Sequence, residues 1–248
     1  MQVILEHFFP RLETNFNQNQ NMYRDNYLIF PEVTEVEISR IFSSSANDKA
    51  PGPDGLTTGI IRELYDSNKN LFINIMNTLL CHGYFPTIWK EARVALIPKE
   101  GKDLKIVTSY RPICLLSTWG KILDKVITKR LQFELEVNGK FDDCQHGFRR
   151  GKSTLSALQV FTDFIKSAKD EKLITLAIAF DISNAFNSIR WKDIMTCLQE
   201  DNISEYLLKI IASFLSDRKI VDYDFDILSS MTVGFPRARL WDQFCGCS

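Results

Sequence analysis

Apolar residues along most of the chain recur at three- and four-residue spacing, the pattern of helices with one buried face. The first such helix begins at Thr34, where Thr-x-x-Glu with Glu37 forms a capping box, and continues to about Ser44. The same spacing predicts further helices around residues 60–65, 71–80, 119–131, 155–168, 191–198 and 203–214. In the helix capped by Ser153 or Thr154, the residues expected to face inward are Leu155, Leu158, Phe161, Phe164, Ile165 and Ala168.

Other segments have the pattern of strands. Ala92–Pro98 and Tyr110–Leu116 flank a polar loop, and together they predict an antiparallel pair. An unbroken run of apolar or small residues, Leu173–Phe180, is too short to span a membrane and is typical of a fully buried strand. A strand-like tail covers Ile220–Leu228.

Asp181 directly follows the buried run. A carboxylate at this place either caps the next turn or meets a cation at the edge of the sheet. Taken alone, the residue type favours capping, because Asp is a preferred N-cap residue. The acidic residues of Tyr223-Asp-Phe-Asp226 fit the outward positions of an edge strand.

Composition sets the limits of the fold and shows where charge collects. The 248 residues, 45% of them apolar, are enough for one large or two small globular domains. The net charge of −1 does not indicate nucleic-acid binding, yet residues 90–152 hold 14 Lys and Arg against 8 Asp and Glu. This basic middle is either a solvated surface or a track for a phosphate backbone, and composition alone favours the solvated surface.

The spacing of the cysteines and the first residues of the chain indicate which cellular compartment to expect. Six cysteines without a Cys-x-x-Cys pair indicate neither a zinc site nor a disulfide framework. Glu6 interrupts the first apolar stretch, so no signal peptide is expected, and we find no transmembrane segment. An intracellular protein in a reducing compartment is therefore expected. Residues 1–30, which are rich in Asn and Gln, are predicted to be a poorly ordered lead-in.

Several short motifs occur in an order that resembles a known family. Ala-Phe-Asp-Ile-Ser-Asn-Ala-Phe-Asn-Ser-Ile, residues 179–189, is similar to the first catalytic motif of reverse transcriptases of jockey-like non-LTR retrotransposons. Other signatures of that family precede it: Lys49-Ala-Pro-Gly-Pro-Asp-Gly55, Tyr84-Phe-Pro with Trp89-Lys90, Ile97-Pro-Lys99, Tyr110-Arg-Pro-Ile113 and Gln145-His-Gly-Phe-Arg-Arg-Gly-Lys-Ser-Thr154. The first of these also reads as a rigid turn, because two prolines and two glycines break both helices and strands.

The resemblance implies an α/β fold and a division of the chain. A reverse-transcriptase-like fingers region is expected over residues 31–170, followed by a partial palm over residues 171–236. The palm is expected to be an antiparallel sheet with packed helices, truncated at its C-terminal end. Residues 237–248 form an aberrant tail.

The resemblance also implies roles for individual residues. Asp181 would be the catalytic ligand of Mg²⁺ or Mn²⁺, and Phe186, with Ile182, would contact the incoming nucleotide, Phe186 beneath its sugar. Lys99 and Arg111, at the two strand–loop junctions of the hairpin, would lie against the triphosphate of that nucleotide. The expected partners are an RNA template, a DNA primer and deoxynucleotide triphosphates, and the loop residues expected to contact the template are Arg149, Arg150 and Lys152.

The resemblance stops abruptly after Gly234-Phe-Pro236. The family continues with Gln-Gly-Ser-x-Leu-Gly-Pro, and codons allowed for the residues from Arg237 onward give this string when read one base earlier. We therefore hypothesise a frameshift between Pro236 and Arg237. The family's later Tyr-x-Asp-Asp motif does not occur in the chain, so the chain alone is predicted to be inactive. The alternatives are a non-catalytic nucleic-acid-binding remnant and a pseudogene product.

Overall fold

The computed structural model describes residues 28–47, 49–180, 189–222 and 227–230. Several predictions fall outside these residues and keep the standing of predictions. They concern the lead-in up to residue 27, the acidic segment Tyr223–Asp226, the change of frame after Pro236 with the tail that follows, and the three motif residues Asp181, Ile182 and Phe186.

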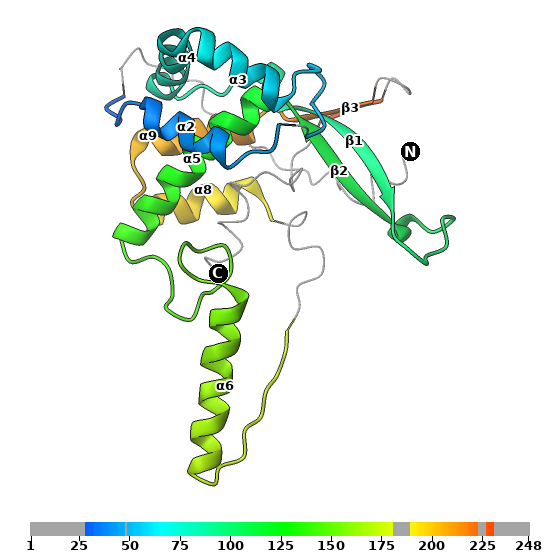
Figure 1. Cartoon of the computed structure of the whole chain (residues 1–248), viewed down its shortest axis with the longest axis vertical. Coiled ribbons are helices and arrows are strands. Elements are labelled where there is room, and N and C mark those ends of the chain that lie inside the picture. Colours follow the sequence, from blue (N-terminus) through cyan, green and yellow to red (C-terminus); the bar gives the residue numbers. More distant parts are fainter. Residues whose placement is uncertain (1–27, 48, 181–188, 223–226, 231–248) are drawn as a thin grey trace.

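A body of helices surrounds the main apolar core (Figure 1). The helices that contribute to this core are α2 (Glu35–Ser43), α3 (Thr58–Ser67), α4 (Lys69–Cys81), α5 (Thr118–Val137), α8 (Trp191–Glu200) and α9 (Glu205–Leu215). The predicted start of α2 is confirmed, because the Thr34 hydroxyl accepts a hydrogen bond from the Glu37 amide at 3.2 Å. The other half of the predicted capping box is wrong, because the Glu37 carboxylate accepts hydrogen bonds from Arg130 at 3.0 and 3.3 Å. The long helix α5 contributes Leu123, Ile127 and Leu131, all fully buried.

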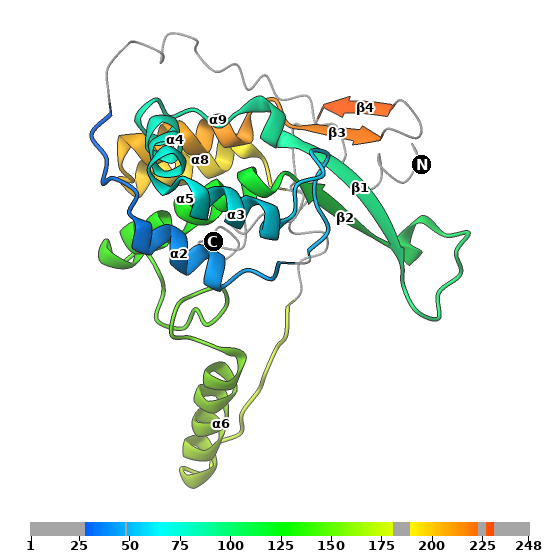
Figure 2. The ribbon, with the colours of Figure 1, turned by 45° about the horizontal axis from the view of Figure 1, so that its top comes forward.

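A four-stranded sheet lies beside the helical body (Figure 2), with strand order β2-β1-β3-β4. The 3-10 turn η2 (Thr87–Lys90) leads into β1 (Glu91–Pro98), and η3 (Val107–Ser109) leads into β2 (Tyr110–Leu116). The predicted antiparallel hairpin of β1 and β2 is confirmed, with Ile97 opposite Arg111. However, β1 pairs in parallel with β3 (Lys219–Asp222), so the described sheet is mixed and not purely antiparallel.

The single tail strand predicted over Ile220–Leu228 is wrong. The structure has two short strands there, β3 and β4 (Ile227–Ser230), which pair antiparallel with Asp222 opposite Ile227. The two strands therefore run in opposite directions. Strand β4 satisfies the backbone hydrogen-bonding groups along the edge of β3 that faces away from β1.

Helix α6 (Thr154–Asp170) departs from the predicted core. Its start is as expected, because Ser153 and Ser156 form a reciprocal capping box. The prediction that its apolar stripe faces inward is wrong: α6 contains no buried residue, and Leu155 is 73% exposed. Figure 1 shows α6 projecting away from the helical body. The helical period was correct, but no described element buries the stripe made by Leu155, Leu158, Phe161, Phe164, Ile165 and Ala168.

The predicted buried strand Leu173–Phe180 is also wrong. This segment is extended but pairs with none of the described strands, and its apolar side chains are exposed, Ile174 to 99%. It runs back alongside α6 in both views (Figures 1 and 2). A strand becomes buried only when neighbouring strands take up its backbone hydrogen bonds, and the described part of the chain provides no such neighbour.

The loop over residues 49–55 is a compact turn that packs on the start of α5. The Gly55 amide donates to the Gly52 carbonyl at 3.1 Å, and Gly55 takes a positive φ of 69° that suits glycine. The Asp54 carboxylate accepts from the Ser117 hydroxyl at 2.6 Å, and the Thr118 hydroxyl donates to the Leu56 carbonyl at 2.6 Å. These bonds fix the turn against the point where β2 passes into α5.

Candidate nucleic-acid interface

Lys99 and Arg111 lie on the same face of the β1–β2 hairpin. Arg111 is directly opposite Ile97, and Lys99 follows Ile97 by two residues, so strand alternation turns both basic residues to one side. Arg111 is exposed, and within the described part of the chain its guanidinium has no hydrogen bond or ion pair. The Lys99 ammonium instead donates to the Thr108 carbonyl at 2.7 Å. The structure thus brings the two residues to one face, while a shared ligand remains a prediction.

Arg93 is a third basic residue on this face, and the sequence analysis did not single it out. It lies four residues before Ile97 on β1, which corresponds to about 13 Å along a strand. Its side chain is exposed and, among the residues with described positions, has no hydrogen bond or ion pair. The signal was available in the alternation of Arg93, Ala95, Ile97 and Lys99. We call the surface made by Arg93, Ile97, Arg111 and Ile113 the open face of the hairpin.

The open face combines positive charge with aliphatic side chains. Ile97 and Ile113 are 46% and 36% exposed; Ile97 lies opposite Arg111, and Ile113 lies between the levels of Arg111 and Arg93. Guanidinium groups bind phosphate oxygens, and exposed apolar side chains can pack against sugars and bases. The arrangement suits an extended phosphate chain more than a compact anion.

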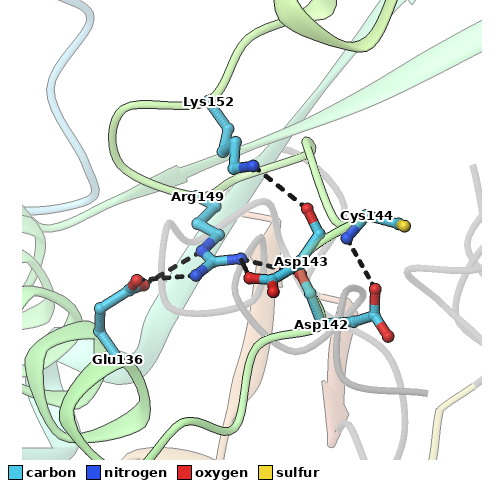
Figure 3. A network of polar contacts seen from close by, with 6 residues as sticks. All are labelled: Glu136, Asp142, Asp143, Cys144, Arg149 and Lys152. Atoms are coloured by element: carbon cyan, nitrogen blue, oxygen red, sulfur yellow. Dashed lines mark hydrogen bonds and ion pairs between the residues drawn. The ribbon is translucent and has the colours of Figure 1, made fainter. Parts of the chain in front are cut away.

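A second basic group lies in the loop between α5 and α6, and Figure 3 shows its contacts. The Arg149 guanidinium donates two hydrogen bonds to the Glu136 carboxylate, at 2.8 and 3.2 Å, and one to the Asp142 carbonyl at 2.8 Å. It also lies over the Phe141 ring, 5.4 Å from its centre. Hydrogen bonding from Arg149 lowers the pKa of Glu136, and the same bond raises the pKa of Arg149.

These contacts change the expectation for each of the three loop residues. The Arg149 side chain is only 12% exposed and already paired with Glu136, so a phosphate would have to compete with that carboxylate. Lys152 donates to the Asp143 carbonyl at 3.1 Å. Arg150 is exposed, with no side-chain bond in the described structure, and is the best placed of the three. Their contact with a template remains a prediction.

The two basic groups lie at opposite ends of α5. Strand β2 ends just before the first residue of this helix, whereas the loop that holds Arg149 follows its last residue. A helix of 20 residues is about 30 Å long. One compact ligand therefore cannot touch both groups, but a nucleic-acid strand several nucleotides long could.

No metal centre can be built from the described residues. They contain no group of three or more His, Cys, Asp or Glu side chains that could hold an ion. His146, which replaces an apolar residue of the motif, has its Nδ1 atom 2.8 Å from the Ser156 hydroxyl and so ties the loop to the start of α6. Asp181, the predicted ligand, lies outside the described residues. No described helix is long and apolar enough to cross a membrane.

A comparison with protein-family models identifies the family of the chain. Residues 97–238 match the family model described as reverse transcriptase (RNA-dependent DNA polymerase), and this range is more than half of the chain. The chain therefore belongs to the reverse transcriptase family. The matched range includes Lys99, Arg111 and the loop around Arg149.

Relatives among mobile elements narrow this assignment. The chain is 32% identical to the RNA-directed DNA polymerase from mobile element jockey of Drosophila melanogaster, over 75% of this chain and 20% of that protein. It is 29% identical to the probable RNA-directed DNA polymerase from transposon BS of the same organism, over 94% of this chain and 28% of that protein. It is 30% identical to the Pol polyprotein of retrotransposable element R2 of Popillia japonica, over 68% of this chain and 22% of that protein. The chain thus spans only 20% to 28% of the length of these relatives.

Proposed function

We propose that the chain is part of an RNA-directed DNA polymerase of a non-LTR mobile element. The observation that carries this proposal is the hairpin register, in which Ile97 opposite Arg111 turns Lys99 and Arg111 to one face within the region that matches the family. The substrates are an RNA template, a DNA primer and deoxynucleotide triphosphates. The residues 31–170 act as fingers and 171–236 as a partial palm, sharing a core in which α9 packs against α4 and α5.

In the proposed reaction, the basic hairpin residues bind the triphosphate of the incoming nucleotide. Nucleotidyl transfer builds negative charge on the leaving pyrophosphate, and fixed cations beside it lower the barrier. Arg111 can reach such an anion directly, while Lys99 would exchange its bond to the Thr108 carbonyl for one to a phosphate oxygen. Ile182 and Phe186 are assigned to the nucleotide and its sugar.

Asp181 is the residue of this chain that would hold a divalent cation. When bound, Mg²⁺ or Mn²⁺ supplies activation of the primer hydroxyl and neutralisation of the triphosphate, and two such ions are held by carboxylates from separate strands. The chain contains Asp181 but no Tyr-x-Asp-Asp string. We therefore infer that these 248 residues alone do not extend a primer at a measurable rate.

Primer extension on an RNA template, with Mg²⁺ or Mn²⁺, tests this inference. We expect binding of the primer–template without extension. Extension that disappears in Asp181→Ala would contradict the inferred inactivity and establish the chain as a polymerase by itself. Absence of both extension and binding would remove the support for the proposed function.

The open face gives a second measurement, which also addresses the alternative of a non-catalytic nucleic-acid-binding remnant. We expect Arg93→Ala and Arg111→Ala each to weaken RNA binding and to reduce the slope of log affinity against log salt by about 0.7. Arg40→Ala, which removes an exposed arginine from α2, is the matched control and should leave both quantities unchanged. Salt-dependent binding that persists without any extension in longer chains carrying the missing motif would favour the remnant.

A further inference from the structure

A cavity of about 200 Å³ lies beside the first turns of α5, away from the open face of the hairpin. One of its walls is aromatic. Phe85 meets Trp89 edge-on with ring centres 6.2 Å apart and meets Phe214 in the same way at 4.9 Å. Helix α5 packs closely on this wall at Gly120, where a Cβ atom would lie only 3.1 Å from the Trp89 carbonyl oxygen.

The other walls of the cavity are strongly basic. Lys121 and Lys125 line it from successive turns of α5, Lys49 lines it from the loop opposite, and Arg218 lies in its wall with 1% exposure. The acid that lines the cavity is Asp124, whose negative charge acts on Arg218. The described residues of the lining therefore include four basic side chains and one acidic side chain.

The surroundings of the lysines indicate that an anion would be favoured there. Burial lowers the pKa of Lys121, nearby Asp54 raises it, and the neighbouring charge of Lys49 lowers it. Lys125 is bonded to the hydroxyl of Ser45, which also lines the cavity, so its ammonium group lies at the cavity. Several ammonium groups beside an apolar wall form a site in which hydrogen bonds to a phosphate are stronger than they would be in water.

We propose that this cavity binds a phosphate-bearing ligand, with the phosphate held by Lys49, Lys121 and Lys125 and a flat apolar portion of the ligand against Phe85 and Trp89. A nucleoside monophosphate has this combination, and so does one nucleotide of a single strand. Arg93, Lys99 and Arg111 do not line the cavity, so the site is separate from the open face of the hairpin and does not depend on the polymerase assignment.

Binding can be followed with the full 248-residue chain. The probes are pyrophosphate, AMP, adenosine and a ten-nucleotide oligo(dT), with Trp fluorescence as the readout because Trp89 lines the site. We expect at least one of the phosphate-bearing probes to bind, and adenosine, which lacks the phosphate, not to bind. The double variant Lys121→Met with Lys125→Met should bind at least about tenfold more weakly, since hydrogen bonds to charged groups are worth this much.

Lys129→Met is the matched control, because it removes the same charge from the next turn of α5 but does not line the cavity. Its affinity should stay within about twofold of the wild type. Binding of AMP and pyrophosphate that the double variant loses supports a free nucleotide as the source of the phosphate. Binding of oligo(dT) alone, lost in the same variant, supports a strand. Failure of all probes to bind, or equal weakening by Lys129→Met, overturns the proposal.

A measurement on the wild-type chain removes any dependence on the folding of the variants. Acetylation of lysines, followed by mass spectrometry, reports on each ammonium group separately. The bound ligand should slow the acetylation of Lys121 and Lys125 and leave that of Lys129 unchanged. Equal rates with and without ligand at Lys121 and Lys125 would contradict the proposal.

Discussion

Gly52 packs directly on the backbone of Leu116: a Cβ atom at Gly52 would lie 2.4 Å from the Leu116 carbonyl carbon. The same atom would lie 2.5 Å from the amide nitrogen of Ser117. The turn of residues 49–55 can therefore reach the start of α5 only with glycine at this position. This contact, together with the Asp54–Ser117 bond, also positions Lys49 opposite Lys121.

We expect Gly52→Ala to lower the free energy of unfolding by about 2 kcal/mol or more, because the backbone of β2 cannot move aside easily. Urea unfolding followed by circular dichroism measures this change. Gly59→Ala is the control, since its nearest neighbours would be 3.8 Å from the new Cβ and it lies in α3. Alanine should be neutral there or stabilise by up to about 1 kcal/mol. Equal destabilisation by the two changes would contradict the packing described for Gly52.

The ion pair between Arg130 and Glu37 joins α5 to α2. Two hydrogen bonds, at 3.0 and 3.3 Å, connect their largely buried head groups. We expect Arg130→Met to cost about 2 to 3 kcal/mol of unfolding free energy, because Glu37 keeps its charge without a partner. The exposed Lys69–Glu35 pair is the comparison, and Lys69→Met should change stability little.

A double-mutant cycle separates the ion pair from the loss of each side chain. If Arg130→Met in a Glu37→Gln background costs as much as it does alone, the two residues do not interact energetically. The structure predicts a smaller cost in that background.

Lys90 makes the free energy of unfolding depend on pH in the alkaline range. Its side chain is 2% exposed, and burial lowers its pKa to about 8, although the charge of Asp217 raises it. The unfolded chain therefore holds the proton more tightly than the folded chain between pH 8 and about 10.5. Wild-type stability should rise with pH through this window, by at most about 1.4 kcal/mol per pH unit.

Lys90→Met removes this titration and the buried charge. We expect the variant to be more stable than the wild type at pH 7, with the difference shrinking as pH rises above 8. Thermal or urea unfolding of both proteins from pH 7 to 9.5 tests the prediction, and taking the difference cancels the other groups that titrate there. A constant difference would show that the Lys90 amine is not desolvated as described.

The exposed face of α6 predicts an unusual tolerance to truncation of large apolar residues. Leu158→Ala should cost less than about 0.5 kcal/mol, because Leu158 is 61% exposed. The control is Leu123→Ala in α5, where full burial predicts a loss of about 2 to 5 kcal/mol. Comparable losses at the two positions would mean that α6 is packed in solution.

Local features were predictable from the sequence where nearby residues determine them. The cap at Thr34, the capping residue Ser153 and the hairpin of β1 and β2 all depend on contacts within a few residues or on a single loop. The residues that determine these features lie within short stretches of sequence, and the structure confirms all three predictions. The family resemblance rested on such strings as well, and the match over residues 97–238 confirms it.

Features that depend on distant partners were not predictable in the same way. The stripe of α6 and the run Leu173–Phe180 are apolar, but apolarity says nothing of whether a neighbouring element will cover them. The parallel pairing of β1 with β3 joins segments with no local signal for each other. In the candidate site, the alternation that groups Arg93 with Ile97 and Lys99 was visible in the sequence, but its position on the same face as Arg111 depends on the hairpin register. The basic cavity depends on Lys49 and Lys121 meeting across the fold.

The pairing of Glu91 with Lys219 links positions 128 residues apart in the chain. At synthesis rates of 5 to 20 residues per second, the ribosome needs roughly 6 to 26 seconds to deliver β3 after β1 has emerged. During this interval the edge of β1 that later pairs with β3 has no partner, and it can pair with a strand of another nascent copy. Translation speed, and chaperones that shield this edge, should therefore influence how much of the protein reaches its native state.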